Sequence, residues 1–167
     1  MKFFFDESRF GLITQCAKRW MAKGIRPQIK IEIKYEYIYL YEAINPKKGE
    51  NFELIMPDMT TNSMNIFLEK LSEYLGERKI VLVMDNASSH RSKKLKIPKN
   101  IKIEYLPPYC PELNPVERFF QDAKKYIKNK IFGTLDKLEE ELIEILKSYD
   151  FLDVKSLTFF EYLREVI

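Results

Sequence analysis

Hydrophobic and polar residues alternate most clearly over residues 28–44, QIKIEIKYEYIYLYEAI. Every odd-numbered position from Ile29 to Ala43 is apolar or aromatic, whereas the even-numbered positions are charged until Ile38. A period of two residues is that of a β-strand, and the change to apolar residues on both faces after Glu36 indicates burial on both sides. The pattern therefore predicts a strand over 28–44, buried most deeply in its second half.

Shorter apolar stretches predict the remaining strands. They are residues 2–6, a segment that begins near Phe10 and ends before a turn at 23–27, and the stretches 52–56, 79–85 and 101–106. The turn 45–51, NPKKGEN, makes 52–56 the hairpin partner of the long strand. The run 79–85, KIVLVMD, is apolar without interruption, which is typical of a strand at the centre of a sheet.

Apolar residues recur at helical spacing in some of the intervals between these strands and after the last of them. A helix is expected from Thr60 or Thr61 to Gly76, and another from Asn114 to about Lys130. Two further helices are expected after caps at Thr134 and Ser156. The proline-rich segment 107–115, PPYCPELNP, is expected to be an extended connector without regular structure.

These elements predict one α/β domain over residues 1–167. Three antiparallel strands, a crossover helix and two further strands would form a mixed sheet that is flanked by helices. Its C-terminal helices carry an apolar stripe, for which we expect packing on the domain's own sheet rather than dimerisation. The stripe consists of Leu135, Leu138, Leu142 and Ile145.

Composition narrows the class of protein. The chain has 167 residues, 46% of them hydrophobic and 32% charged, which is the balance of a globular domain. No apolar run approaches the roughly 20 residues that cross a bilayer, and the acid at position 6 leaves no room for a signal peptide. A cytoplasmic protein is therefore expected. Two cysteines without a CxxC motif exclude a thiolate metal site, so any metal ligands would be oxygens.

Charge is distributed unevenly along the chain. Residues 134–167 contain nine acidic and four basic residues, whereas residues 1–133 contain sixteen acidic and 24 basic ones. The bases cluster in 18–26, 91–102 and 118–130. This asymmetry is typical of a surface that faces a polyanion such as DNA, although solvated basic loops would produce the same pattern.

Three carboxylates could be brought together by such a fold. Asp6 and Asp85 stand at the ends of two predicted strands, and Glu117 lies in the first turn of a predicted helix. If the two strands are neighbours, their carboxylates lie side by side at the edge where ligand sites form. Oxygen ligands of this kind suit Mg²⁺ or Mn²⁺ and a phosphoryl transfer assisted by two ions.

Each of these residues also has a plain structural interpretation. Glu7 competes with Asp6 as the acid of the first strand, and Asp85 could simply begin a turn. Asn114, Pro115 and Glu117 resemble a helix capping box, which would make Glu117 structural.

The order of three motifs resembles the catalytic domain of the IS630/Tc1/mariner superfamily of DDE transposases, in particular the IS630 family. The motifs are 5-FDESRFG-11, 82-LVMDNASSH-90 and 105-YLPPYCPELNPVE-117, and the resemblance runs from Phe3 to about Lys130. It implies an RNase H-like fold in which Asp6, Asp85 and Glu117 are catalytic and hold two Mg²⁺ or Mn²⁺ ions.

The resemblance also implies an activity and partners. Members of the family cut DNA at transposon ends and join the freed 3′ hydroxyl to target DNA at a TA dinucleotide, and a homodimer is expected. Asn86 and His90 would shape the metal site or contact DNA. Further DNA contacts are expected from Arg91, Lys124, Lys125, Lys128 and Trp20.

Two features depart from the family pattern. The chain starts just before the first catalytic strand, so the N-terminal helix-turn-helix region of the family is expected to be absent or supplied by a separate polypeptide. The interval between Asp85 and Glu117 is also slightly short, which indicates a trimmed loop near 91–100. A plain RNase H-like nuclease and a non-catalytic DNA-binding remnant therefore remain alternatives to an active transposase domain.

Overall fold

The structure is a computed structural model that describes residues 1–18, 20–25, 28–86, 92, 94–108 and 110–164. Its centre is a five-stranded mixed sheet with the order β3-β2-β1-β4-β5. The strands are β1 (Lys2–Gly11), β2 (Tyr37–Asn45), β3 (Glu50–Met56), β4 (Ile80–Met84) and β5 (Ile101–Tyr105). The first three are antiparallel, and β4 and β5 run parallel to β1. The predicted RNase H-like arrangement of strands is confirmed.

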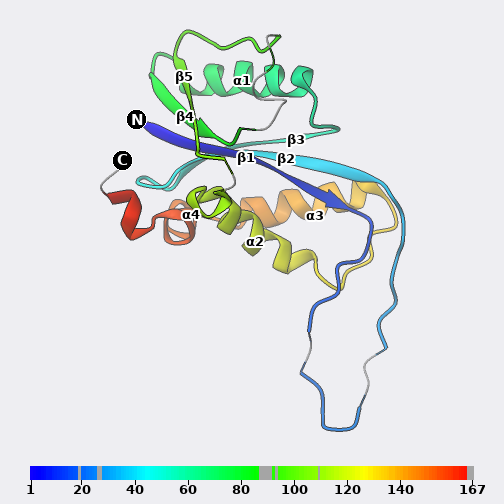
Figure 1. The fold of residues 1–167 in the computed structure, drawn as a ribbon. Helices are drawn as coiled ribbons and strands as arrows, with labels where there is room; N and C mark the ends of the chain where they lie inside the picture. The colour runs from blue at the N-terminus through cyan, green and yellow to red at the C-terminus, as the bar shows by residue number, and fades with distance from the viewer. Residues whose placement is uncertain (19, 26–27, 87–91, 93, 109, 165–167) are drawn as a thin grey trace.

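Helices cover both faces of this sheet (Figure 1). Helix α1 (Thr61–Leu75) is the crossover between β3 and β4 and lies alone on one face. The opposite face carries α2 (Val116–Ile127), α3 (Leu135–Lys147) and α4 (Phe151–Thr158). Two short 3₁₀ helices, Pro111–Leu113 and Glu161–Arg164, precede α2 and follow α4.

The face under α1 is closed by aromatic side chains. Phe5, Tyr41 and Phe67 are fully buried, and their ring centroids lie 4.8–5.9 Å apart. Tilted aromatic pairs at such distances add to the stabilisation that burial of their apolar area provides.

The other face is covered mainly by the apolar stripes of α2 and α3. Phe119 and Ala123 of α2 and Leu138 and Leu142 of α3 are fully buried in one cluster with β1 and β2. The stripe of α3 therefore packs on the domain's own sheet, as expected, and is not available for dimerisation.

The long alternating segment forms a strand only in its second half, which corrects the prediction for 28–44. Strand β2 begins at Tyr37, whereas Ile31, Ile33 and Tyr35 are 58%, 62% and 76% exposed. Strand β1 ends at Gly11, which pairs with Tyr37. The residues that precede Tyr37 therefore have no continuous partner strand. Alternation gave the right period, but a strand also needs a partner for its backbone groups.

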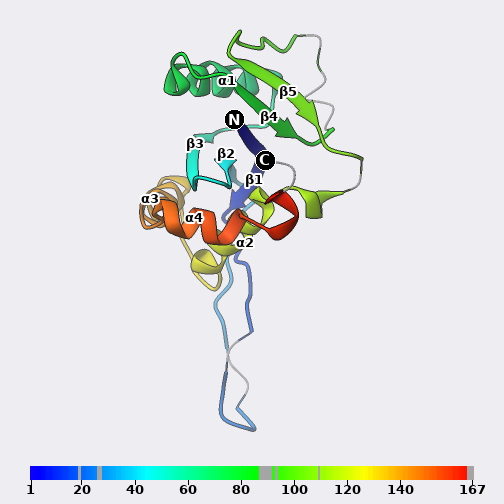
Figure 2. The same cartoon turned by 90° about the vertical axis from the view of Figure 1, so that its left-hand side faces the viewer.

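The described residues between 12 and 36 instead form an arm that projects from the body of the domain (Figures 1 and 2). The described residues at its base are tied to the connection between α2 and α3. Asn129 accepts a hydrogen bond from the Ala17 amide at 3.0 Å and donates its own amide to Gln15 at 2.8 Å. On the other side, the amide of Gly133 donates to the Glu32 carboxylate at 3.0 Å. The base of the arm is thus fixed to the α2–α3 connection, while Trp20 is fully exposed.

Three smaller predictions were also wrong. No separate strand begins near Phe10, because β1 continues through it to Gly11. Ser156 lies inside α4, whose cap is Asp150: its carboxylate accepts the amides of Leu152 and Asp153 in a capping box. The connector 107–115 contains a 3₁₀ turn rather than only extended chain.

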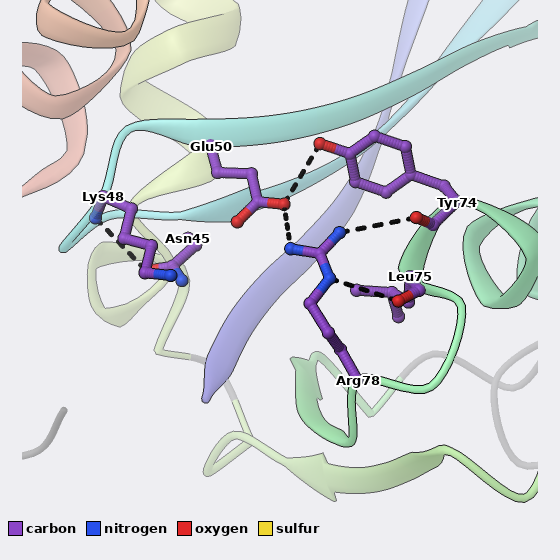
Figure 3. Close-up of polar contacts among 6 residues, drawn as sticks. All are labelled: Asn45, Lys48, Glu50, Tyr74, Leu75 and Arg78. Atoms are coloured by element: carbon purple, nitrogen blue, oxygen red, sulfur yellow. Dashed lines mark hydrogen bonds and ion pairs between the residues drawn. The ribbon is translucent and has the colours of Figure 1, made fainter.

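A polar cluster joins the start of β3 to the end of α1 (Figure 3). The Arg78 guanidinium donates to the Glu50 carboxylate at 2.5 Å, and the Tyr74 hydroxyl donates to the same oxygen at 3.1 Å. Nearby, the side-chain oxygen of Asn45 accepts the Lys48 amide at 3.3 Å in the turn between β2 and β3. These contacts fix the edge of the sheet away from the candidate site.

No helix within the described ranges is long and apolar enough to cross a membrane.

Candidate active site

The parallel pairing of β1 and β4 brings two of the predicted acids together. Phe4 is paired with Val83, and the same register continued by two residues brings Asp6 beside Asp85. Because side chains alternate along a strand, both carboxylates belong to the sheet face of Phe4 and Val83, which α2 covers. The expectation that the strands of Asp6 and Asp85 are neighbours is confirmed, although the central strand of the sheet is β1 rather than β4.

The same alternation separates Asp6 from Glu7. Asp6 is paired with Glu42, on the face of α2, whereas Glu7 is paired with Tyr41, whose ring packs under α1. The amide of Glu7 donates to the Asp6 carboxylate at 2.9 Å. Of the two neighbouring acids, only Asp6 lies on the same face as α2 and its Glu117.

Glu117 occupies the first turn of α2, but the capping box expected there is not formed. Pro115 is the first residue with helical dihedral angles, and the side chain of Asn114 accepts the amide of Val116 at 3.3 Å. No described residue donates a hydrogen bond to the Glu117 carboxylate. The structural role proposed for Glu117 as a cap is therefore wrong, and its carboxylate is available to a ligand.

Asn114 connects the helix to the first acid. It is 3% exposed, and its side-chain amide donates to the Phe5 carbonyl at 3.0 Å and to the Asp6 carboxylate at 3.3 Å. Sequence reasoning identified Asn114 only as a helix cap, because a contact between residues so distant in the chain leaves no local signal.

The electrostatic environment of Asp6 is that of an acid among other acids. Burial and the neighbouring carboxylates of Glu117 and Asp85 raise its pKa to about 7, against the lowering effect of the Glu7 amide. Such repulsion between carboxylates is relieved by a cation between them. Glu117, Glu7 and Asp85 thus all raise the pKa of Asp6, and the shared site of Asp6, Asp85 and Glu117 stays a prediction.

The residues around Asp85 are fixed by the ends of β4 and β5. The Asn86 side chain donates to the Leu106 carbonyl at 2.6 Å, and the Leu106 amide donates to Met84 at 2.8 Å. Asn86 therefore holds the proline-rich connector against the strand end. His90 and Arg91 lie outside the described residues.

Of the predicted lysines, Lys124 lies nearest to the acids. It is half-buried, with its ammonium 5.4 Å from the centre of the Phe10 ring. Burial lowers its pKa, and Glu117 and Asp6 act in the opposite direction. Lys125 instead forms an ion pair with Asp122 at 2.5 Å, and Lys128 follows the last residue of α2.

A second acidic feature was not predicted from the sequence. Glu42 is fully buried next to Asp6 in the sheet, and on its other side it is paired with Glu53. Neither carboxylate oxygen of Glu42 makes a hydrogen bond of good geometry to a described residue, although Asn51 lies near it. Burial raises the pKa of Glu42 and of Glu53. The only sequence signal was an acid within the apolar stretch 37–45.

The carboxylates of Asp6, Asp85 and Glu117 suit a hard divalent cation, although they do not form a closed cluster. Within the described ranges, no three His, Cys, Asp or Glu side chains gather closely enough to form a ready-made metal site. The chemistry of the donors nevertheless suits Mg²⁺ or Mn²⁺, which prefer carboxylates and retain several waters. A cation bound beside Asp6 would lower its raised pKa again.

Comparisons with known proteins identify the family and the fold of this chain. Residues 2–139 match the family described as DDE superfamily endonuclease. A protein of Sinorhizobium fredii (strain NBRC 101917 / NGR234), described as uncharacterized protein y4pE/y4sA, is 35% identical over 102 residues, which are 60% of this chain and 76% of that protein.

Solved structures with the same fold include complexes of Mos1 transposase. The Mos1 strand transfer complex superimposes with a TM-score of 0.73 at 14% identity, and the Mos1 mariner paired end complex with Mn with 0.75 at 13%. Each covers 94% of this chain, which spans about half of the Mos1 chain. A chain of the simian T-cell lymphotropic virus intasome complex with PP2A regulatory subunit B56 gamma matches with a TM-score of 0.53 at 13% identity, over 95% of this chain and 46% of its own length.

The sheet order is that of an RNase H-like domain, a fold that this chain shares with the Mos1 transposase complexes. The chain belongs to the DDE superfamily endonuclease family.

Proposed function

We propose that this domain cleaves DNA at transposon ends and joins the freed 3′ hydroxyl to target DNA. The observation that carries the proposal is the register of β1 and β4, which brings Asp6 beside Asp85 on the face of α2. Membership of the DDE superfamily endonuclease family supports the cleavage of DNA, and the fold shared with Mos1 transposase supports strand transfer. Target joining at a TA dinucleotide is part of the proposal.

Asp6, Asp85 and Glu117 are proposed to hold two Mg²⁺ or Mn²⁺ ions. Structures of Mos1 paired end complexes with Mn and with Mg support this choice of metal. When bound, such ions lower the pKa of an attacking oxygen and stabilise the leaving oxygen of the phosphodiester. Because Glu117 and Asp85 both raise the pKa of Asp6, its carboxylate is the one that would contribute to the binding of both ions.

The remaining residues of the site are proposed to position DNA. Lys124 lies close enough to the acids to neutralise a phosphate that enters the site. Lys125, Lys128 and Arg91 would add phosphate contacts, which do not depend on sequence and weaken with salt. Trp20 is exposed at the arm and could stack on a base, and Asn86 and His90 would shape the region behind Asp85.

Cleavage and strand transfer would be two successive steps, neither of which needs a covalent protein intermediate. Water attacks a phosphodiester, so that one strand ends in a 3′ hydroxyl and the other product retains the 5′ phosphate. The 3′ hydroxyl then attacks a target phosphodiester, and a target 3′ oxygen leaves. Across both steps this chain's residues hold the reacting groups in line, and its carboxylates are not consumed.

The partners of the domain are also proposals. Binding of transposon ends is proposed to require a helix-turn-helix region, whether in the same protein or in a separate polypeptide, because this chain spans about half of the Mos1 transposase chain. A homodimer would hold two ends together, as the Mos1 paired-end complex suggests. A DNA substrate and the bacterial relative are consistent with action at a chromosome in the prokaryotic cytoplasm.

The test is nicking of supercoiled plasmid by the purified chain with Mg²⁺, with Mn²⁺ and with EDTA, beside the variant Asp85→Asn. We expect nicking that needs the metal and disappears in Asp85→Asn, while salt-sensitive DNA binding is retained. Cleavage that survives in Asp85→Asn would exclude the assignment of Asp85.

Strand transfer is tested in the same reaction with a pre-cut donor end. Nicking without joined product would favour a plain nuclease. If no nicking occurs, the assay is repeated with a helix-turn-helix region supplied. Activity gained in that way would identify a missing end-binding partner, and continued inactivity would favour a non-catalytic remnant.

A further inference from the structure

Asn114 contacts the two elements that carry Asp6 and Glu117, which are β1 and α2. Its side-chain nitrogen donates to the Phe5 carbonyl at 3.0 Å and to the Asp6 carboxylate at 3.3 Å, and so holds β1. Its side-chain oxygen accepts the Val116 amide at 3.3 Å, and its carbonyl accepts the Glu117 amide at the same distance. One buried side chain therefore links strand β1 to the first turn of α2.

The contacts use both hydrogens that the amide can donate. One hydrogen is directed to the β1 backbone, which fixes the position of the side chain, and the other is directed to the carboxylate. The second oxygen of Asp6 accepts the Glu7 amide at 2.9 Å, so each carboxylate oxygen has one donor. Two donors at different oxygens fix the orientation of a carboxylate, because rotation about its side-chain bonds would break one of them.

We infer that Asn114 is a positioning residue, which holds Asp6 and the Glu117 end of α2 in the mutual arrangement that binds a divalent cation; the inference rests on the proposed function. Helix α2 packs on the sheet through apolar contacts, which are not directional. The hydrogen bonds of Asn114 are directional, and they fix the first turn of α2 relative to β1. Groups that orient metal ligands through hydrogen bonds typically change metal affinity by about 10–100-fold when they are removed.

Replacement by serine separates this role from that of a helix cap. Asn114→Ser keeps a hydroxyl that can accept the Val116 amide, since serine caps helices well, but its side chain is too short to donate to Asp6. Asn45→Ser is the matched control. Asn45 is another buried asparagine, 2% exposed, whose side chain accepts a backbone amide at the far edge of the sheet (Figure 3).

The experiment measures Mn²⁺ affinity of the purified chain by calorimetry and thermal unfolding without metal. We expect Asn114→Ser to weaken Mn²⁺ binding by about 10–100-fold, and Asn45→Ser to leave it unchanged at a similar loss of Tm. In the nicking assay the Mn²⁺ concentration for half-maximal rate should rise by the same factor, and excess Mn²⁺ should restore much of the rate. A fold defect alone would not be restored in this way.

Unchanged Mn²⁺ affinity in Asn114→Ser would overturn the inference, as would an equal loss in Asn45→Ser or a wild-type chain that binds no Mn²⁺. If Asn114→Ser does not fold, Asn114→Thr provides the same comparison with a different capping hydroxyl. A wild-type chain that binds Mn²⁺ but does not nick even with a helix-turn-helix region supplied would contradict the proposed function alone, and the difference in affinity would still decide the role of Asn114.

Discussion

The two faces of the sheet are built by the same strands but differ in what they bury. Under α1 the strands contribute Phe5 and Tyr41 to a closed aromatic cluster with Phe67. Under α2 the same strands contribute Asp6 and Glu42, side by side, with Glu53 in the next strand. One face thus serves stability through burial, whereas the other carries acids whose pKa values are raised by burial.

The difference teaches that burial has opposite consequences for the two kinds of side chain. Removing an aromatic ring from water stabilises the fold, but removing a carboxylate from water costs free energy unless it is protonated or paired. The acids are therefore expected to reduce stability, and for Asp6 the proposed metal binding would explain why a carboxylate stands inside a strand. Substitutions on the two faces should separate stability from activity.

The variant with the largest expected effect is Glu117→Gln, on the α2 face, which should abolish activity. The amide keeps the shape of the side chain but is a poor ligand for a divalent cation. We expect nicking of supercoiled plasmid to fall to the level of the EDTA control, with little change in the thermal unfolding of the metal-free chain. Glu112→Gln, in the 3₁₀ turn before α2, is the matched control and should retain activity. Nicking by Glu117→Gln at the wild-type rate would remove Glu117 from the site.

On the α1 face, Phe67→Ala should reduce stability. The ring is fully buried against Phe5, Tyr41 and Phe52, and deletions of this kind cost about 3–5 kcal/mol. Urea unfolding monitored by circular dichroism measures the loss. Tyr74→Ala, a partly exposed ring on the same helix, should cost much less. Equal losses in the two variants would contradict the closed core under α1.

The buried acids predict a stability that falls as the pH rises. Glu42 and Glu53 have raised pKa values, so between the unfolded value of 4.5 and the folded value they are protonated only when the chain is folded. Their contribution is complete below pH 4.5 and is lost as the pH rises through the folded pKa, and Asp6, with a pKa of about 7, acts in the same direction. The lowered pKa values of Asp58 and Asp122 contribute stability that is present above their unfolded value of 3.8 and is lost only as the pH falls below it.

Glu42→Gln should therefore flatten the decrease in Tm between pH 5 and pH 8 in metal-free buffer. The amide does not ionise, so the variant should gain stability relative to the wild type as the pH rises. Each kcal/mol corresponds to a shift of about 2–4 °C for a chain of this size. Exposed Glu69 provides the control, since Glu69→Gln should leave the slope unchanged. An unaltered slope in Glu42→Gln would show that Glu42 does not titrate as its burial implies.

The smallest effect is expected outside both faces, at Trp20 on the arm. This is the chain's single tryptophan and it is fully exposed, so its fluorescence reports directly on contact with DNA. Trp20→Ala should leave Tm unchanged and weaken DNA binding by about 1 kcal/mol, the lower end of base stacking energies. Met21→Ala is the control on the same arm. Fluorescence that does not change on addition of DNA would exclude Trp20 from the interface.

The local pattern of the sequence was sufficient for most of the fold. Helix α1, the continuous apolar strand β4 and the hairpin of β2 and β3 were predicted because period, caps and turn residues are properties of neighbouring residues. The same local signals misplaced the cap of α4 at Ser156 and extended β2 back to residue 28. Whether an alternating segment becomes a strand depends on a partner, which its own residues do not specify.

The sequence by itself determined which acids were candidates, because Asp6, Asp85 and Glu117 lie at predicted element ends. Only the tertiary structure decided between Asp6 and Glu7, excluded the capping box at Glu117 and revealed the contacts of Asn114 and the burial of Glu42. The physical reason is that register and burial arise from contacts between residues far apart in the chain. A side chain's face, its hydrogen-bond partners and its pKa all follow from those contacts.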